Sequence, residues 1–352
     1  MRIVVLGLSL SSSWGNGHAT TYRALLRAFA ARGHEILFLE RQVPWYTAHR
    51  DLAEPAYCRL AFYDSLDALE AWRGEMAAAD AVILGSFVPE GIAVGDRVQR
   101  IARLAAFYDI DTPVTLAGLA RGEESYLAAR QIAGFDLYLS FTAGPTLALL
   151  ESEYQSPAAR QLYCSVDVDA YRPMDLPHRW DLSYLGTYSD DRQPMLERLL
   201  LEPARRAPHR RFVVAGAQYP DTIAWPDNVE RIAHLPPERH AAFYAQSRFT
   251  LNVTRADMVR AGYSPSVRLF EAGACATPLI SDNWRGLDEL LRPDREILIA
   301  EDDDTVLDAL DMAEPQRRAM ATTLRTRILA EHSSARRAAE LEDYLLSAAP
   351  AS

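Results

Sequence analysis

The sequence predicts an α/β protein of two domains, each built on a mostly parallel sheet covered by helices. Strand-like and helix-like segments alternate along the chain, which is typical of such sheets. At 352 residues the chain exceeds the usual size of one domain. The alternation stops once, over residues 165–181, where Pro173 and Pro177 break the periodicity. The expected boundaries are residues 1–168 for the first domain, 169–330 for the second and 331–352 for a terminal helix.

The first domain is expected to begin with a strand over residues 2–10 and a helix over residues 18–32. Apolar residues recur at helical spacing in that helix, and Gly33 follows it as a helix-ending residue. The further expected elements are strands over residues 34–39, 81–84, 104–108, 135–140 and 161–164 and a helix over residues 92–103.

The second domain repeats the alternation. Its expected strands cover residues 182–186, 211–215, 229–233, 249–253 and 279–281, and its helices cover residues 192–205, 237–247 and the surroundings of Glu271. From about residue 314 the chain is rich in Arg and Ala and is expected to be helical. Two similar Rossmann-like halves are therefore expected.

The composition is that of an ordinary globular protein, with 49% hydrophobic and 24% charged residues. A net charge of -11 argues against nucleic acid as a partner, because phosphates attract basic surfaces. Cys58, Cys164 and Cys275 have neither zinc-ligand nor disulfide-framework spacing, which favours a reducing cytoplasm. The apolar run at the N-terminus is read as a strand and not as a signal peptide. No run reaches the roughly 18 apolar residues of a membrane span, so we expect no integral membrane segment.

A glycine-containing turn joins the first strand to the first helix. Gly15 and Gly17 allow a tight turn, and the following helix start directs free amides at an incoming ligand. His18 is a candidate catalytic acid or base, because histidine exchanges protons near neutral pH. Capping of the helix is the alternative role for His18. Trp14 is placed with the two glycines on the side that would bind an acceptor substrate, where its ring could stack on a sugar or an aromatic acceptor, although packing is the favoured role for an aromatic residue there.

The same turn permits a second interpretation, an NAD-binding site. Residues 15–20 lack the third glycine of the G-x-G-x-x-G pattern, but Glu40 ends the second strand where a ribose-binding acid would lie. An NAD-dependent oxidoreductase therefore stays an alternative.

Two carboxylates follow the strand over residues 104–108. Asp109 and Asp111 lie where open α/β sheets collect ligands. We take Asp109 as a candidate general base or acceptor-hydroxyl ligand and place Asp111 on the acceptor side, with a helix cap or turn as its alternative role. The Asp-x-Asp spacing also matches the metal-diphosphate motif of one-domain GT-A enzymes, but this chain has a second Rossmann-like half.

In the second domain, polar and basic residues follow three successive elements. A glycine-containing loop over residues 185–192, the strand end at residues 252–255 and the turn over residues 263–268 would all face one ligand. Arg268 and Glu271 share a helix face, since they are three residues apart.

Residues 264–272, 185–192 and 107–113 together resemble the CgeB-like group of GT-B glycosyltransferases, which is named after a spore-maturation protein. The resemblance is sharpest over residues 180–292. It implies two Rossmann-like domains facing across a cleft, with the first binding the acceptor, the second binding the nucleotide sugar, and the C-terminal helix packing back toward the first domain.

The implied activity is transfer of a sugar from a nucleotide-diphosphate sugar to an unidentified small-molecule, glycan or protein acceptor. The implied reaction requires no obligatory metal and no cofactor beyond the donor, whose UDP, GDP or dTDP type stays open. In this resemblance Glu271 accepts hydrogen bonds from the ribose. The implied donor-binding residues are Gly186, Tyr188, Arg192, Asn252, Arg255, Tyr263, Ser266, Arg268 and Glu271.

The sequence departs from the family pattern at one position. Many retaining GT-B enzymes have two glutamates eight residues apart, the second of which matches Glu271, but the first would fall on Tyr263. A tyrosine supplies no carboxylate, so inverting and retaining mechanisms both stay open. A catalytically silent module that binds a nucleotide sugar is therefore a further alternative.

Overall fold

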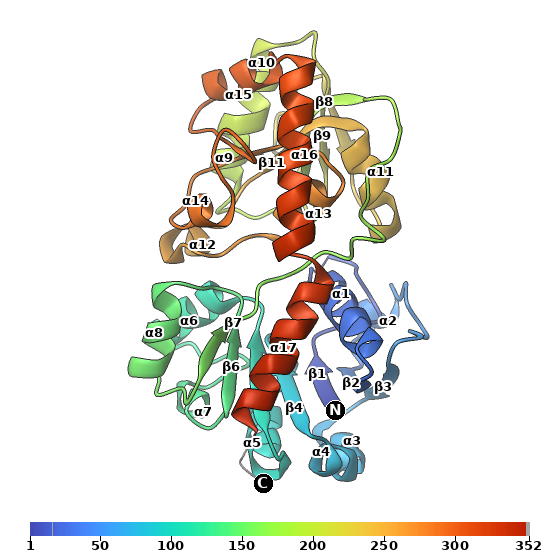
Figure 1. The fold of residues 1–352 in the computed structure, drawn as a ribbon, viewed down its shortest axis with the longest axis vertical. Helices are drawn as coiled ribbons and strands as arrows, with labels where there is room; N and C mark the ends of the chain where they lie inside the picture. The colour runs from blue at the N-terminus through green and yellow to red at the C-terminus, as the bar shows by residue number, and fades with distance from the viewer. Residues whose placement is uncertain (16, 350–352) are drawn as a thin grey trace. The chain divides into compact units, whose positions relative to one another are not determined.

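The computed structural model describes residues 1–15 and 17–349, which form two compact units. The first unit comprises Met1–Cys164 and the segment from Ser334 onward, and the second comprises Ser165–Ser333 (Figure 1). Each unit has its own sheet and its own hydrophobic core.

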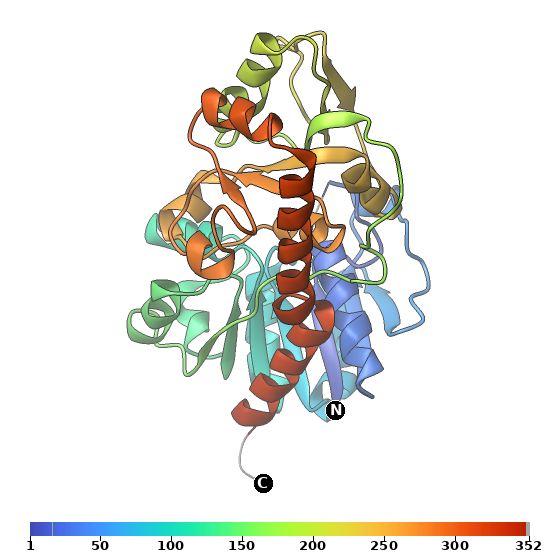
Figure 2. The same ribbon diagram turned by 45° about the horizontal axis from the view of Figure 1, so that its top comes forward.

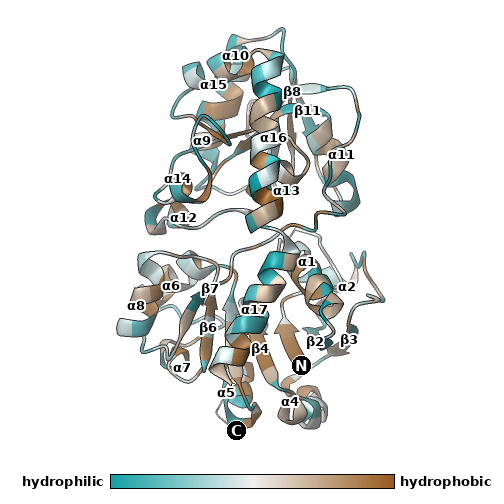
Figure 3. Ribbon diagram, in the orientation of Figure 1, coloured by the Kyte–Doolittle hydropathy of each residue, from teal (hydrophilic) through white to brown (hydrophobic). Residues whose placement is uncertain are grey.

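The first unit is built on a seven-stranded parallel sheet in the order β3-β2-β1-β4-β5-β6-β7. Its strands are β1 (Arg2–Gly7), β2 (Glu35–Arg41), β3 (Arg59–Tyr63), β4 (Ala81–Gly85), β5 (Ala105–Asp109), β6 (Leu137–Ser140) and β7 (Ala159–Gln161). Every residue of β4 and β5 is buried, as expected when helices cover both faces of a parallel sheet. In Figure 3, β1 and β4 are coloured as hydrophobic segments.

Helices surround this sheet and carry the chain back to its N-terminal edge after each strand. They are α1 (His18–Ala31), α2 (Pro44–Thr47), α3 (Leu66–Leu69), α4 (Arg73–Ala78), α5 (Gly91–Ile101), α6 (Thr112–Ala120), α7 (Ala129–Ile132) and α8 (Pro145–Ser152). Each helix that follows a strand begins at the carboxyl edge of the sheet, so the loops at that edge hold the candidate residues of this unit.

The last helix, α17 (Ser334–Ala348), belongs to the first unit. It packs against α1 and β6, and both ribbon views show it beside α1 (Figures 1 and 2). Buried Ala338, Leu341 and Leu345 form its inner face, and Glu342 accepts a hydrogen bond of 2.6 Å from Nε of Arg32, the residue that follows α1. The expected return of the C-terminal helix to the N-terminal domain is therefore confirmed.

The second unit holds a six-stranded parallel sheet in the order β10-β9-β8-β11-β12-β13. Its strands are β8 (Trp180–Leu185), β9 (Phe212–Ala215), β10 (Val229–Ile232), β11 (Ser247–Asn252), β12 (Leu279–Ser281) and β13 (Leu298–Ile299). Its helices are α9 (Gln193–Leu196), α10 (Glu202–Arg206), α11 (His240–Ala245), α12 (Ala256–Ala261), α13 (Val267–Ala274), α14 (Leu287–Leu290), α15 (Asp303–Leu310) and α16 (Glu314–Glu331).

Two helices of this unit are packed closely enough to exclude a side chain between them. A Cβ atom added to Gly273 of α13 would lie 2.6 Å from Cγ1 of Ile328 on α16. This contact holds α13, the helix that carries Arg268 and Glu271, against the long α16.

Some elements differ from the expectation. The expected helix over residues 192–205 contains a π-helical turn, Glu197–Leu201, between α9 and α10. The strands β3 and β13 were not expected, because β3 is a partly exposed edge strand and β13 has only two residues. The seventh strand lies at Ala159–Gln161 and not at residues 161–164. None of the described helices has the length and apolar character needed to span a bilayer.

Candidate active site

A histidine and a carboxylate meet at the carboxyl edge of the first sheet. His18 is the first residue of α1, which follows β1, and Asp111 follows β5. Nε2 of His18 lies 2.7 Å from Oδ2 of Asp111, and only 10% of the histidine side chain is exposed. The other ring nitrogen, Nδ1, is buried and has no hydrogen-bond partner among residues 1–15 and 17–349. Among the described residues, the pair therefore leaves one imidazole nitrogen without a hydrogen bond.

Asp109 lies behind this pair and is fully buried. Its carboxylate accepts hydrogen bonds from the hydroxyls of Tyr138 at 2.5 Å and Thr115 at 2.8 Å, and from the amide of Asp111 at 3.2 Å. Burial raises the pKa of Asp109 to about 7, and the nearby charge of Asp111 acts in the same direction. The structure brings Asp111, and not Asp109, to His18.

The buried Asp109 predicts how stability depends on pH. Its pKa of about 7 in the folded protein lies above its ordinary value of 3.8, so between these values the folded state binds more protons than the unfolded state. The free energy of unfolding should therefore fall as pH rises from about 4 to about 7, by up to about 1.4 kcal/mol per pH unit from this group. Urea unfolding at about pH 4.5 and about pH 6.5 measures this slope.

Replacing Asp109 by asparagine should remove that contribution, whereas Asp169→Asn, at an exposed position, should leave the slope unchanged. An unchanged slope in Asp109→Asn would show that this carboxyl does not titrate across that range.

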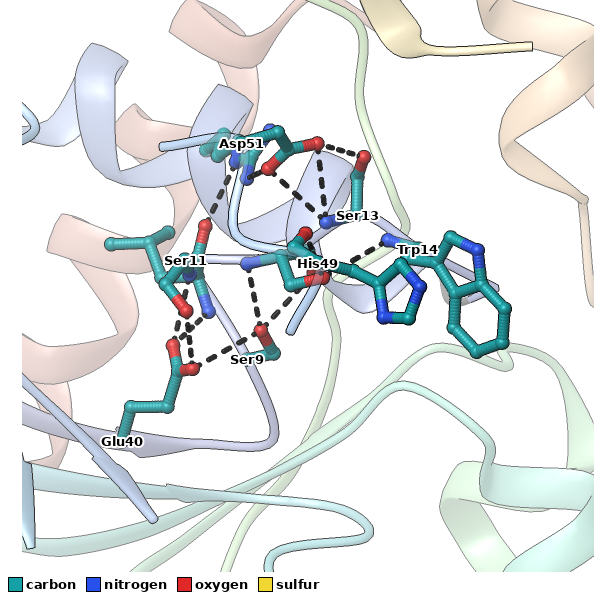
Figure 4. Close-up of polar contacts among 10 residues, drawn as sticks. Ser9, Ser11, Ser13, Trp14, Glu40, His49 and Asp51 are labelled. Carbon is teal, nitrogen blue, oxygen red and sulfur yellow. Dashed lines mark hydrogen bonds and ion pairs between the residues drawn. The ribbon is translucent and has the colours of Figure 1, made fainter. Parts of the chain in front are cut away.

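Glu40, at the end of β2, anchors the loop that precedes His18 (Figure 4). Its Oε2 atom accepts hydrogen bonds from the amides of Leu10 at 2.7 Å and Ser11 at 2.9 Å. Its Oε1 atom accepts from the hydroxyls of Ser11 at 2.6 Å and Ser9 at 3.4 Å. These bonds use the four acceptor positions of a carboxylate, and Glu40 is only 1% exposed. Glu40 is therefore engaged by its own loop, and it is not placed to bind the ribose of NAD as the alternative interpretation requires.

The loop continues through Trp14 to the start of α1. The indole of Trp14 stacks on His49 with ring centroids 4.4 Å apart, and Ser13 bonds to Asp51 (Figure 4). Gly15 has a φ of +67°, which favours glycine, and Gly17 accepts a helical hydrogen bond from the amide of Thr21 at 3.2 Å. Asn16, part of the predicted turn, lies outside the described residues. The structure thus places Trp14, Gly15 and Gly17 in the segment that leads to His18.

In the second unit, four predicted donor-binding residues form one cluster at the carboxyl edge of the sheet. Nη1 of Arg268 donates to Oδ1 of Asn252 at 2.7 Å, and Nε donates to the carbonyl of Leu185 at 2.7 Å. The Ser266 hydroxyl donates to the same Asn252 oxygen at 2.7 Å. A Cβ added to Gly186 would lie 3.0 Å from Nη2 of Arg268, so glycine leaves room for the guanidinium.

Arg268 is 7% exposed, yet no carboxylate lies within ion-pair distance of it among the residues that the structure describes. Arg317 and Arg337, which are buried to a similar degree, pair with Glu314 and Glu340. A buried cation without an anionic partner is costly, because burial removes its hydration. The surroundings of Arg268 therefore suit an anionic ligand.

Glu271 lies one turn further along α13 and is 4% exposed. Its Oε2 atom accepts a hydrogen bond from the Tyr244 hydroxyl at 3.2 Å and lies 3.8 Å from Nδ1 of His240. The same ring nitrogen is 3.0 Å from the Tyr171 hydroxyl. Sequence reasoning missed these three neighbours, because they come from α11 and from the connection before β8, where no motif marks them.

The other predicted donor-binding side chains have partners outside this cluster. The Tyr188 hydroxyl donates to Asp190 at 2.6 Å, and the Tyr263 hydroxyl donates to Glu289 at 2.8 Å. Nη2 of Arg192 donates to the carbonyl of Thr187 at 2.7 Å, and Nε of Arg255 lies 3.6 Å from Asp191. Arg192 therefore lies at the carbonyl of Thr187, and Arg255 lies near Asp191. Neither arginine is part of the Arg268 cluster.

Phe87 is a further residue that sequence reasoning missed. It follows β4 at the carboxyl edge, and its ring meets that of His18 edge to face with centroids 5.9 Å apart. The sequence could have indicated Phe87 as a site residue, because it lies just after a buried strand and before Pro89.

Within the described parts of the chain, no three His, Cys, Asp or Glu side chains are grouped closely enough to hold a metal ion.

Residues 192–343 match the model of a protein family described as glycosyl transferase-like. The matched segment contains both Arg268 and Glu271. No sequence among the curated proteins matches this chain.

Solved structures share the fold over nearly the whole chain. Sucrose-phosphate synthase from Thermosynechococcus elongatus is 15% identical, with a TM-score of 0.74 over 98% of both chains. HepE from Anabaena in complex with UDP-glucose is 10% identical, with a TM-score of 0.70 over 99% of this chain and 100% of that one. An alpha-glucosyltransferase in complex with UDP is 13% identical, with a TM-score of 0.73 over 98% of this chain and 100% of that one. The expected GT-B fold is confirmed.

Proposed function

We propose that this protein transfers a sugar from a UDP-sugar donor to a hydroxyl group of an acceptor. The match of residues 192–343 to a glycosyl transferase-like family supports the reaction class. The UDP and UDP-glucose complexes of two proteins of the same fold support uracil as the base of the donor. In this proposal the second unit binds the donor and the first unit binds the acceptor. The segments at residues 264–272, 185–192 and 107–113 further support placement in the CgeB-like group.

The observation that carries the proposal is the buried guanidinium of Arg268. It has no carboxylate partner among the described residues, lies beside Gly186 and is held by Asn252 and the carbonyl of Leu185. A diphosphate would supply the missing negative charge, and arginine binds phosphate oxygens through two parallel hydrogen bonds. Glu271, one turn along the same helix, would accept hydrogen bonds from the ribose hydroxyls.

The proposed reaction exchanges one bond at the donor sugar for another. The acceptor oxygen attacks the C1 atom of the donor sugar, its proton passes to the base, and the bond from C1 to the diphosphate oxygen breaks with its electron pair leaving on UDP. Arg268 stabilises the charge that develops on the diphosphate, and electrostatic stabilisation of this kind usually contributes most to the rate enhancement. The proposed reaction uses no metal ion.

His18 is the proposed base. Because Asp111 accepts the hydrogen of Nε2, the neutral imidazole carries its proton there and keeps a lone pair on Nδ1. Nδ1 would take the acceptor proton, and Asp111 would then stabilise the imidazolium that forms. Ser86, whose hydroxyl lies 3.4 Å from Oδ2 of Asp111, helps to hold that carboxylate in place.

A thermal-shift comparison of UDP, GDP, dTDP and ADP with NAD(H), each with and without EDTA, tests the donor. UDP at about 100 times its dissociation constant should add roughly 2.7 kcal/mol of stability and raise the melting midpoint by a few degrees, with or without EDTA. The shift should be lost in Arg268→Ala and retained in Arg317→Ala, since Arg317 is equally buried but paired with Glu314. A shift with NAD(H) alone would contradict the proposal.

A further inference from the structure

A histidine and a tyrosine meet beside Glu271 in the second unit. His240 is the first residue of α11, and Tyr171 belongs to the connection that precedes β8. Nδ1 of His240 lies 3.0 Å from the Tyr171 hydroxyl and 3.8 Å from Oε2 of Glu271. Tyr171 is 8% exposed, and the side chains of His240 and Glu271 are 12% and 5% exposed. Neither His240 nor Tyr171 has a role in the reaction proposed above.

The hydrogen bonds of His240 determine which ring nitrogen carries the hydrogen. Nε2 lies 3.1 Å from the carbonyl of Leu235, which can only accept a hydrogen bond, so Nε2 holds the hydrogen of the neutral ring. Nδ1 then presents a lone pair to the Tyr171 hydroxyl and to the Glu271 carboxylate. The neutral ring therefore turns its acceptor nitrogen toward a carboxylate.

The neutral arrangement has fewer hydrogens than acceptors. Burial raises the pKa of the Tyr171 hydroxyl well above its ordinary value, and the charge of Glu271 and a hydrogen bond with Glu271 act in the same direction. Tyr171 thus contacts both Glu271 and Nδ1 of His240, but its single hydrogen serves only one of these acceptors. A proton on Nδ1 would let His240 donate to the Tyr171 oxygen while Tyr171 donates to Glu271.

A protonated His240 would also supply a charge that Glu271 lacks. Among the described residues, no arginine lies within ion-pair distance of the Glu271 carboxylate, and His240 is its one basic neighbour. A buried carboxylate is stabilised by an opposite charge close by. The geometry therefore favours an imidazolium at this position.

The other titratable groups around His240 do not change charge near neutral pH. Burial raises the pKa of the Tyr244 hydroxyl and the pKa of the Cys275 thiol well above their ordinary values, so both stay uncharged. Four side chains of the elements packed against α11 carry charges that are constant over this range: Glu238, Arg239, Arg248 and Arg268. His240 is thus the group near Glu271 whose charge can change, because histidine exchanges protons near neutral pH.

We propose that His240 is a positioning residue for Glu271, and that binding of UDP favours the protonated form of its ring. The imidazolium and Tyr171 would hold Oε2 of Glu271, so that Oε1 meets the ribose hydroxyls. The diphosphate, bound at Arg268 in the same unit, adds negative charge that attracts the imidazolium. This inference rests on the proposed function, because it concerns how the same site binds the ribose.

The sign of the pH dependence follows from the proton count. The complex with UDP binds more protons than the free protein, so the affinity for UDP should fall as pH rises through the range in which histidine titrates. The contribution of His240 is present where the ring is protonated and is lost at higher pH.

Three variants separate this role from a merely structural one. His240→Asn removes the titratable ring and keeps a polar group near the position of Nδ1. Tyr171→Phe removes the hydroxyl that joins His240 to Glu271, and it is the second variant in case His240→Asn does not fold. His209→Asn, at an exposed position of the same unit, is the matched control.

The first measurement is the affinity for UDP by isothermal titration at about pH 6 and about pH 8. His240→Asn should weaken UDP binding about tenfold at the lower pH and less than about twofold at the higher pH. The ratio of wild-type to variant affinity cancels the ionisation of UDP itself, which is the same for both proteins. His209→Asn should match the wild type at both pH values. An equal loss at both pH values, or no loss in the folded variants, would overturn the inference.

The second measurement tests whether His240 acts through Glu271. At about pH 6, His240→Asn should weaken UDP binding less than about twofold once Glu271 has been replaced by alanine, because residues that act through one contact are not additive. Tyr171→Phe should behave in the same way. Additive effects of the His240 and Glu271 substitutions would overturn the inference.

A third measurement needs no ligand. Nitrogen NMR of the His240 ring at about pH 8 should show the hydrogen on Nε2 and a lone pair on Nδ1. A hydrogen on Nδ1 at that pH would overturn the inference. If the wild type does not bind UDP at either pH, the proposed function fails, and the NMR measurement still decides whether Nδ1 faces Glu271 as an acceptor.

Discussion

Replacing His18 by alanine is expected to lower turnover by about 10²- to 10⁴-fold, the usual contribution of a positioned general base. The variant loses the imidazole that the structure pairs with Asp111, and with it the lone pair on Nδ1. Donor binding should persist, since Arg268 and Glu271 belong to the second unit. Rates of UDP release, measured beside the thermal shift with UDP, separate the two effects.

Two further variants sharpen this result. Asp111→Asn should lower turnover less than His18→Ala, because the base remains but loses the charge that stabilises its protonated form. His209→Ala, at an exposed position of the second unit, should leave turnover unchanged. Normal turnover in a folded His18→Ala protein would reduce His18 to a residue that only begins α1.

Replacing Glu271 by alanine should weaken UDP binding roughly 10- to 150-fold. Ribose hydroxyls would lose a charged acceptor, and a hydrogen bond to a charged group is worth about 1.5 to 3 kcal/mol. Isothermal titration with UDP measures the change. Unchanged affinity for UDP in the folded variant would show that Glu271 does not bind the ribose.

The control for this variant is Glu296, another buried glutamate of the second unit. Glu296 is 3% exposed and accepts hydrogen bonds from the amide of Arg292 at 2.8 Å and from Nε of Arg327 at 3.3 Å. Glu296→Ala should lower stability without lowering the affinity for UDP. Tyr244→Phe, which removes only the hydroxyl that bonds to Glu271, should have a smaller effect than Glu271→Ala.

Most of the fold could be predicted from the sequence, because long apolar strands and periodic helices leave a local signal. The strands β1 and β12 and the helix α1 lie close to their expected ranges. Elements whose form depends on neighbours far along the chain were missed. The edge strand β3 is partly exposed, and β13 has two residues, which pair with β12.

The candidate site was predictable only where a motif marks a strand end. The sequence predicted that His18, Asp109 and Asp111 lie at the edge of the sheet, but it did not show which of the two carboxylates contacts His18. Asp109 is the carboxylate that turns inward, because the hydroxyls of Tyr138 and Thr115 donate hydrogen bonds to it. These two residues come from elements later in the chain, so the local sequence does not show the contacts. Glu40 illustrates the same limit, since its four hydrogen bonds to residues 9–11 follow from the path of the loop. The surroundings of Glu271 likewise depend on tertiary contacts.

The most direct test of the central claim is release of UDP from UDP-glucose, followed by chromatography with wild-type protein and with His18→Ala, in the presence of alcohol acceptors. We expect the wild type to release UDP together with an equal amount of glycosylated alcohol, and His18→Ala to bind the donor but release UDP at least about a hundredfold more slowly. Binding of UDP-glucose by the wild type without any release of UDP would contradict the account and identify a module that binds nucleotide sugars without transferring them.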